Sequence, residues 1–321
     1  MIMRCKISLL MLFFAWFNIC LPEACLYAWN DRTHALIAYM AFQELSPERR
    51  ETITATLQAH PHYHSYLLRD KPDNCPEDLW VFMRAATWPD YVNNDEHRSD
   101  YHRAKWHYVN FPFLPVNLRP SLNTVQLTTF SPNILTGLDE CYDILAERYP
   151  SPARKAIATA WITHLVADLH QPLHCVNLYN DRFPSGDQGG NKLAVRDGER
   201  IVRLHAYWDN VLGEQKDYDS IVALANEISA PASADVIPSE RSKPLAWSLW
   251  ANDSFAIAVK TVYLNGELPL TEWRKEMLDG GPFDEVPSLS AQYSETAKEV
   301  SKTQVKLAAQ RLAGVLMNVT N

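Results

Sequence analysis

The apolar segment WITHLVADLHQPLH, residues 161 to 174, carries three histidines and one aspartate. Burying such groups is costly unless hydrogen bonds or a metal ion replace the water that they lose. His164 and Asp168 are four residues apart, so a helix places them on one face about one turn from each other. Pro172 bends or ends this helix, which turns His174 toward a neighbouring centre. The segment therefore predicts a buried helix whose polar side chains are candidate metal ligands.

A second pair with the same spacing, His205 and Asp209, lies in the segment LHAYWDNVL. Imidazole and carboxylate groups are common zinc ligands, and two such pairs in apolar surroundings indicate a zinc site. The competing interpretation is that each histidine is a hydrogen-bonded core residue, which is the commoner case for a single buried histidine. His170 lies off the shared helical face, and we interpret it as a core residue that orients its neighbours.

Another histidine tract, HPHYH at residues 60 to 64, is a rival metal site. It reads as an exposed loop without carboxylates nearby, which argues against a metal. His97 and His102 lie in a charged stretch, and we expect both to be solvated.

Helical periodicity dominates the rest of the chain. Apolar residues recur three and four apart over residues 33–45, 134–149, 153–170 and 304–319, and Asn30 or Asp31 is a candidate N-cap for the first of these helices. Strand-like alternation is scarce and predicts a small hairpin within residues 193–204. Proline and glycine mark loops at residues 111–120, 184–190 and 280–288. The predicted fold class is mainly α, a single-domain helical bundle with a small β-hairpin and long functional loops.

The first 28 residues have the features of a secretory signal peptide. Arg4 and Lys6 precede an apolar run from Ile7 to Leu21, and Ala28 offers a small residue for cleavage. An N-terminal membrane anchor is the alternative, although the run is short for a bilayer span. Cleavage between Ala28 and Trp29 predicts a secreted or periplasmic protein with one catalytic domain, residues 29–321, and no membrane insertion after processing.

Cysteine content and charge narrow the function classes. Cys75, Cys141 and Cys175 remain after processing, and an exported protein can form one disulfide from them. No Cys-x-x-Cys pair is present, which argues against a cysteine-based zinc site. The formal net charge of −8 argues against tight binding along a nucleic-acid backbone, which requires clustered lysine and arginine.

Several short motifs, taken in order, resemble the S1/P1 nuclease family, whose fold and trinuclear site are shared by zinc-dependent phospholipase C. These are WxxxxH from Trp29, the WxD that ends at Asp90, WHYVN at 106–110, HxxxDxHQPLH at 164–174, GDxGGN at 186–191 and LHxxWD at 204–209. The C-terminal KLAAQRLAGVLMN is also similar to the last helix of that family, so the resemblance covers essentially residues 29–321.

The resemblance implies three zinc ions per chain. Asp90, His107 and His164 hold the first ion; His34 holds the second with the terminal amine and carbonyl of processed Trp29. Asp168 bridges these two ions, and His174, His205 and Asp209 hold the third. The chemistry of Trp29 also suits chelation, because a freed amine and the adjacent carbonyl close a five-membered ring around a metal.

The same resemblance implies an endonuclease that cleaves single-stranded DNA and RNA to 5′-phosphate products and dephosphorylates 3′-nucleotides. A metal-bridging hydroxide attacks phosphorus, and the third zinc stabilises the leaving 3′-oxygen. Tyr108 is the expected base-stacking aromatic, and Asn191, with Gly189 and Gly190 beside it, is expected to bind a base edge. No stable protein partner is predicted.

Two positions depart from the family pattern. Asn110 stands where an acidic residue is common, so it can orient a water molecule but cannot act as a general base. Asn93 stands where a basic residue is common, and Lys105 is the candidate to replace that cation. These departures bear on rate, pH optimum and substrate preference more than on metal binding.

Two other functions remain as alternatives. A zinc-dependent phospholipase C has a related metal site, but the five-residue step from Trp29 to His34, the aspartate at 209 and the GDxGGN loop favour the nuclease. A non-catalytic zinc-binding protein would not need open coordination positions or a glycine-rich loop beside the metals.

Overall fold

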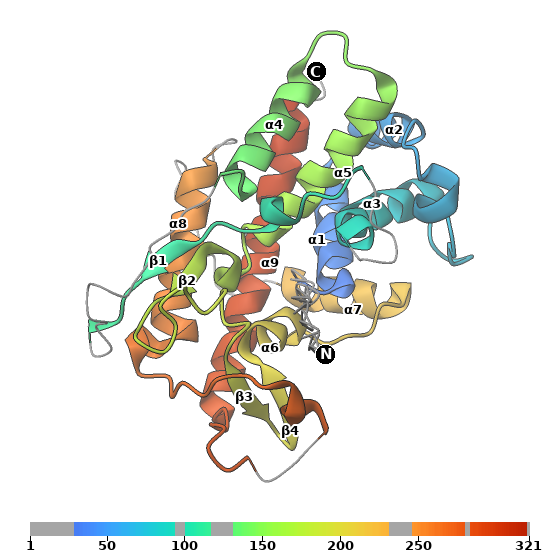
Figure 1. The fold of residues 1–321 in the computed structure, drawn as a ribbon. Coiled ribbons are helices and arrows are strands. Elements are labelled where there is room, and N and C mark those ends of the chain that lie inside the picture. The colour runs from blue at the N-terminus through green and yellow to red at the C-terminus, as the bar shows by residue number, and fades with distance from the viewer. Residues whose placement is uncertain (1–28, 94–99, 117–130, 231–245, 280–282, 320–321) are drawn as a thin grey trace, which may run out of the picture.

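The computed structural model describes residues 29–93, 100–116, 131–230, 246–279 and 283–319. Helices make up most of these residues, as the periodicity predicts (Figure 1). The helices are α1 (Asp31–Glu44), α2 (Pro47–Leu57), α3 (Glu77–Asn93), α4 (Ile134–Ala146), α5 (Pro152–Asp168), α6 (Leu204–Asn210), α7 (Tyr218–Ser229), α8 (Trp247–Ile257) and α9 (Ala291–Val319). The strands are β1 (Phe111–Phe113), β2 (Val176–Leu178), β3 (Ala194–Asp197) and β4 (Arg200–Arg203). The proposed signal peptide, residues 1–28, lies outside the described residues.

Side-chain caps fix where the helices begin. The Asn30 side chain accepts a hydrogen bond from the Thr33 N–H, which selects Asn30 over Asp31 as the N-cap of α1. Ser151 caps α5 in the same way and is followed by Pro152, whose missing N–H costs nothing at the first helical position. Asn133 and Thr136 form a reciprocal capping box at the start of α4.

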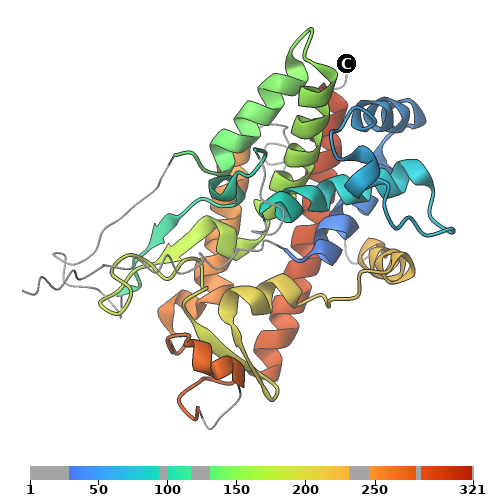
Figure 2. The same cartoon turned by 45° about the vertical axis from the view of Figure 1, so that its right-hand side comes forward.

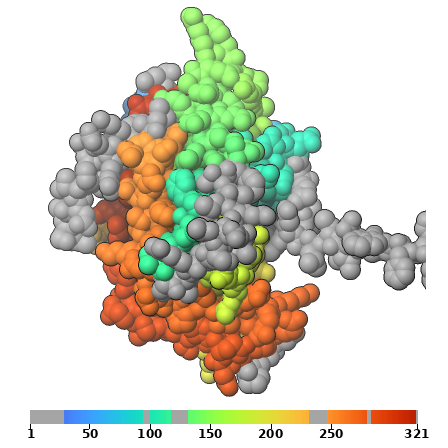
Figure 3. All heavy atoms as spheres, turned by 60° about the vertical axis from the view of Figure 1, so that its left-hand side comes forward, coloured from blue at the N-terminus to red at the C-terminus, as the bar shows by residue number. Residues whose placement is uncertain are grey.

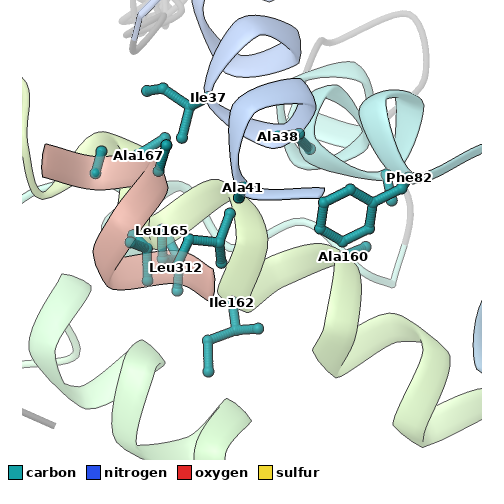
Figure 4. Packing of buried hydrophobic residues seen from close by; sticks show 14 of the residues in the cluster. Ile37, Ala38, Ala41, Phe82, Ala160, Ile162, Leu165, Ala167 and Leu312 are labelled. Carbon is teal, nitrogen blue, oxygen red and sulfur yellow. The ribbon is translucent and has the colours of Figure 1, made fainter. Parts of the chain in front are cut away.

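The core lies between α1, α3, α5 and α9. One apolar cluster contains Ile37 and Ala41 of α1, Phe82 of α3, Leu165 of α5 and Leu312 of α9 (Figure 4). Helix α9 runs through the length of the molecule, and the β3–β4 hairpin and α6 lie at the end opposite the α4–α5 turn (Figures 1 and 2). Helix α8 packs beside α4 on a second face, next to the segment that leads into β1 (Figure 3).

The two small sheets position the functional segments. Strands β3 and β4 form the predicted antiparallel hairpin, with Val195 opposite Val202. Strands β1 and β2 pair in parallel, with Phe111 opposite Val176 and Phe113 opposite Leu178. The expectation of a loop over 111–120 was therefore wrong at its start, because Phe111–Phe113 is a strand; residues 117–120 lie outside the described part. This pairing ties the segment after His107 to the segment after His174.

The expectation of one disulfide among the three remaining cysteines needs correction. Cys75, Cys141 and Cys175 are all buried free thiols, so the described residues contain no disulfide among them. Burial raises the pKa of the Cys75 thiol to about 11, with Lys71 acting in the opposite direction. These thiols are therefore small packing residues rather than cross-links.

The expectation of an exposed HPHYH loop was wrong for His60, although His64 is exposed. His60 is buried, its Nδ1 accepts from the His62 N–H at 3.1 Å, and its ring packs edge-on against Trp88. The Trp88 indole N–H donates to His62 Nδ1 at 3.0 Å. The tract packs against α3 because Trp88 supplies both an apolar face and a donor. Of the two histidines expected to be solvated, His102 is half-buried and His97 lies outside the described residues.

His60 makes stability depend on pH. Burial, followed by the neighbouring His62, lowers the pKa of His60 from 6.5 to about 3. The unfolded chain therefore binds a proton more readily, and the free energy of unfolding should fall as pH drops from 6.5 toward 3. Replacing His60 by asparagine keeps an acceptor for His62 and removes the titration. We expect the fall between pH 6.5 and 4.5 to shrink by about 1–2 kcal/mol in urea unfolding of metal-free protein.

His64 provides the matched control, because it belongs to the same tract and is exposed. His64→Asn should leave the pH dependence of unfolding unchanged. An equal slope in wild type and His60→Asn would contradict this role for His60.

Candidate metal centre

The fold brings eight predicted ligand side chains from six segments into one buried region. Within the described residues they form three triads whose ligand atoms lie within 4.8 Å of one another. The triads are His34, His164 and Asp168; Asp90, His107 and His164; and His174, His205 and Asp209. Helices α1, α3, α5 and α6 supply six of these side chains, and the short 3₁₀ turns η2 (Ala104–His107) and η4 (Pro172–Cys175) supply His107 and His174.

Asp168 lies between the first two triads. Its Oδ2 is 3.0 Å from both His107 Nδ1 and His164 Nε2, whereas its Oδ1 is 3.2 Å from His34 Nε2. Asp90 reaches the same nitrogens at longer range, with its Oδ1 3.6 Å from both His107 and His164. The two carboxylate oxygens of Asp168 therefore face different sets of histidines, which is the arrangement that a bridging ligand requires.

The third triad is built by η4 and α6. His205 and Asp209 lie one turn apart on α6, with Nε2 and Oδ2 separated by 3.6 Å. The ring of His174 lies 5.0 Å from that of His205. Pro172 begins η4 four residues after α5 ends, so the chain turns at the place that the proline predicts.

Backbone carbonyls orient three of the histidine rings. His164 Nδ1 lies 2.8 Å from the Ala86 carbonyl, and His205 Nδ1 lies 2.7 Å from the Gly189 carbonyl. His174 Nδ1 lies 2.5 Å from the His107 carbonyl. When Nδ1 carries the proton and donates to a carbonyl, Nε2 keeps its lone pair for a metal, which is the usual arrangement of metal-binding histidines.

Trp29 begins the described part of the chain and is fully buried. Its indole N–H donates to the Ala167 carbonyl at 3.2 Å, which places Trp29 beside Asp168. The next residue, Asn30, donates through its side chain to Asn210 and to the Gly213 carbonyl. The segment that precedes α1 is therefore anchored beside both α5 and α6.

Several atoms of this ligand set lack a hydrogen-bond partner. Buried side-chain atoms without a hydrogen bond in the described residues include both ring nitrogens of His34, one carboxylate oxygen each of Asp90 and Asp168, and His174 Nε2. Such unpaired polar atoms are rare in protein interiors. Two ligand atoms about 2.0–2.1 Å from a tetrahedral zinc lie roughly 3.3 Å apart, close to the separations within the triads. The residues present therefore fit metal ions.

Electrostatics favours a cation at the same place. Burial raises the pKa of Asp90 to about 8, against the pull of His164, and burial raises the pKa of Asp209 well above its usual value. Burial also lowers the pKa of His34 and His174 to about 4, so both rings are neutral near pH 7. Burial disfavours a charge on His164 too, but Asp168 and Asp90 outweigh it and raise the pKa to about 9. A neutral imidazole can bind a metal without first losing a proton. A buried carboxylate with a raised pKa is stabilised by a nearby positive charge, which a metal ion can supply in place of a proton.

Comparison with known proteins decides the family. A family model described as S1/P1 Nuclease matches residues 29–321, which is nearly the whole chain.

The chain belongs to the S1/P1 nuclease family.

The three triads of the described residues fit the metal ions on which this family depends. The chain is also similar to Endonuclease 4 of Arabidopsis thaliana, with 40% identity over 57 residues. That segment covers 18% of this chain and 17% of the relative. None of the helices in the described ranges is both long and apolar enough to span a bilayer.

One pocket of the structure lies beside the third triad. The pocket has a volume of about 290 Å³ and is lined by Lys105, Tyr108, Asn110, Leu173, His174, Asn177, Ser185, Gln188, Gly189 and His205. Four residues expected near the substrate, Lys105, Tyr108, Asn110 and Gly189, thus border two ligands of the third triad. Asn191 is buried and donates to the Gln188 carbonyl at 3.1 Å, so in this structure its amide holds the loop. Gly190 lies beside it, against Leu204 and His205.

Asn93 lies at the end of α3, where it is buried and its Oδ1 has no hydrogen-bond partner among the described residues.

Sequence reasoning missed Gln171. This fully buried residue donates from Nε2 to Asp209 Oδ1 at 2.7 Å and accepts from the Leu173 N–H. It leaves Asp209 Oδ2 facing His205. The sequence did indicate a role for Gln171, because a buried glutamine in HQPLH needs a hydrogen-bond partner as much as the histidines do. His170, by contrast, is the expected core residue: its Nδ1 pairs with the Val166 carbonyl and its Nε2 with Arg311.

Proposed function

We propose that this S1/P1 nuclease is an exported endonuclease that hydrolyses single-stranded DNA and RNA to 5′-phosphate products and also dephosphorylates 3′-nucleotides. Three zinc ions per chain serve the reaction, held by the three triads together with the processed terminus of Trp29. The observation that carries the proposal is the cluster of buried, unpaired ligand atoms that borders an open pocket with an aromatic residue in its wall.

Zinc supplies activation of water and neutralisation of phosphate charge when it is bound. The chain's own residues do the rest. The carbonyls of Ala86, His107 and Gly189 hold three imidazoles in fixed orientations. Asp168 directs one oxygen to each of the two neighbouring ligand sets. The amide of Asn110 lines the pocket, where it can orient water but cannot take its proton.

The Tyr108 ring in the pocket wall supports the proposed preference for single strands. Tyr108 follows His107 directly and lines the pocket with Lys105. A base can stack on an aromatic ring only after it leaves its neighbours in a duplex, so unpaired strands bind at lower cost. The exposed ammonium of Lys105 offers a cation to the adjoining phosphate.

The direct test is hydrolysis by purified protein that begins at Trp29. We expect digestion of single-stranded DNA and RNA but little of duplex DNA, loss of activity on chelation, recovery with zinc, and about three zinc ions per chain. If the protein hydrolyses phosphatidylcholine and leaves denatured DNA uncleaved, the result would contradict the proposal and favour a phospholipase. Full zinc loading without any phosphodiester hydrolysis would favour a non-catalytic zinc protein.

Tyr108 tests the stacking step. Tyr108→Ala should raise KM for a single-stranded oligonucleotide by about tenfold with little change in kcat, because stacking on one base contributes about 1–3 kcal/mol. Tyr108→Phe keeps the ring and should stay within about twofold of wild type. Equal KM values for the alanine variant and wild type would exclude Tyr108 from base binding.

A further inference from the structure

The GDxGGN segment contains a buried carboxylate that the metal centre does not use. Asp187 is fully buried, and its carboxylate accepts hydrogen bonds from two backbone N–H groups and one tyrosine hydroxyl. Burial raises its pKa to about 6, although its hydrogen bonds act in the opposite direction. Burying a carboxylate costs free energy, and we expect such a group to fix the position of the segments that donate hydrogen bonds to it.

Asp187 makes its hydrogen bonds to three separate elements. Its Oδ1 accepts from the Leu178 N–H of β2 at 2.9 Å. Its Oδ2 accepts from the Gly190 N–H at 3.0 Å and from the Tyr263 hydroxyl at 2.6 Å. Tyr263 follows the short helical turn η5 (Ala258–Val262), is fully buried, and packs against Phe113 of β1. One carboxylate thus joins the 186–191 turn to β2 and to the segment after η5.

The turn held in this way touches both parts of the candidate site. The Gly189 carbonyl orients His205 Nδ1, and Gln188 and Gly189 line the pocket. The backbone here has little freedom: Gly189 has φ +58°, and a Cβ at this position would lie 2.4 Å from the Leu173 carbonyl oxygen. A shift of the turn would therefore move the pocket wall and release the ring of His205 together.

We propose that Asp187 and Tyr263 form a buried positioning pair that fixes the 186–191 turn and, through Gly189, sets both the pocket wall and the orientation of His205. Neither residue touches substrate or metal. The pair acts as a unit, because the Tyr263 hydroxyl and the Gly190 N–H share one carboxylate oxygen. The proposal rests on the proposed function only where it refers to substrate.

Two substitutions separate positioning from general stability. Asp187→Asn removes the buried charge and keeps the shape, but an amide nitrogen cannot accept from Gly190 or Tyr263. Tyr263→Phe removes only the hydroxyl. Tyr63→Phe is the matched control, since Tyr63 is also buried and bonded to a carboxylate, Glu77, far along the chain from the turn.

The experiment uses zinc-loaded protein that begins at Trp29. Hydrogen–deuterium exchange should accelerate in the peptide that covers 186–191 in both variants and stay at the wild-type rate in Tyr63→Phe. KM for a single-stranded oligonucleotide should rise about tenfold, and the chelator concentration that removes zinc from the third triad should fall by a similar factor. The double variant should have the same exchange rate, KM and chelator sensitivity as Asp187→Asn alone.

The outcome that overturns the proposal is a fall in melting temperature in both variants with wild-type exchange at 186–191 and wild-type KM. If Asp187→Asn fails to fold, Tyr263→Phe alone decides the matter. If wild-type protein proves inactive on nucleic acid, the proposed function fails, while the exchange and zinc measurements still test the positioning pair.

Discussion

Asp168→Asn should lower kcat/KM on single-stranded DNA by roughly 1000-fold or more. The substitution keeps the size of the side chain but removes the charge that faces His34 on one side and His107 and His164 on the other. An amide offers one oxygen for coordination instead of two, so it cannot serve both ligand sets. Steady-state kinetics and metal analysis of the same preparation should show activity and bound metal falling together.

The control for this prediction is Asp143→Asn on the exposed face of α4, which should leave both quantities unchanged. Substantial activity in Asp168→Asn with all metal retained would show that the two neighbouring triads do not depend on a shared carboxylate.

One additional residue before Trp29 should cost about one metal ion and lower activity ~100-fold. The physical reason is that an added residue converts the terminal amine into an amide, whose nitrogen has no lone pair to donate. The Trp29 side chain is buried against Ala167, beside Asp168, so the extended chain cannot shift to present its new terminus instead. The comparison requires two preparations, one that begins at Trp29 and one with a single alanine before it.

Melting temperatures of the two preparations without metal should agree, which separates loss of a ligand from loss of folding. Equal metal content and equal turnover would exclude the terminal amine as a ligand. Such a result would also leave the other triads intact as candidates, because their side chains do not depend on the processed end.

Helical spacing made four of the eight ligand side chains predictable, whereas His34, Asp90 and His107 were predicted through the family resemblance. His164 with Asp168, and His205 with Asp209, were found because residues four apart share a helical face. The helices and the β3–β4 hairpin were predictable for the same reason, since their periodicity is local. Asn30 could be chosen as the cap only from the structure, because Asn30 and Asp31 are equally suitable residue types.

The features that escaped prediction depend on contacts that are distant in sequence. Strands β1 and β2 are three residues each and pair across a gap of more than 60 residues, so neither has a recognisable pattern of its own. Partners such as the Ala86 and Gly189 carbonyls are backbone atoms that any residue supplies. The HPHYH tract looked exposed because its polarity is visible in the sequence, whereas the Trp88 that covers it is not adjacent in the chain.

Anomalous X-ray diffraction at the zinc absorption edge, on crystals of protein that begins at Trp29, would locate the metal ions themselves. We expect three anomalous peaks: one among Asp90, His107 and His164, one between His34 and the Trp29 terminus, and one among His174, His205 and Asp209. Crystals grown with ample zinc that show no peak within these triads would contradict this expectation.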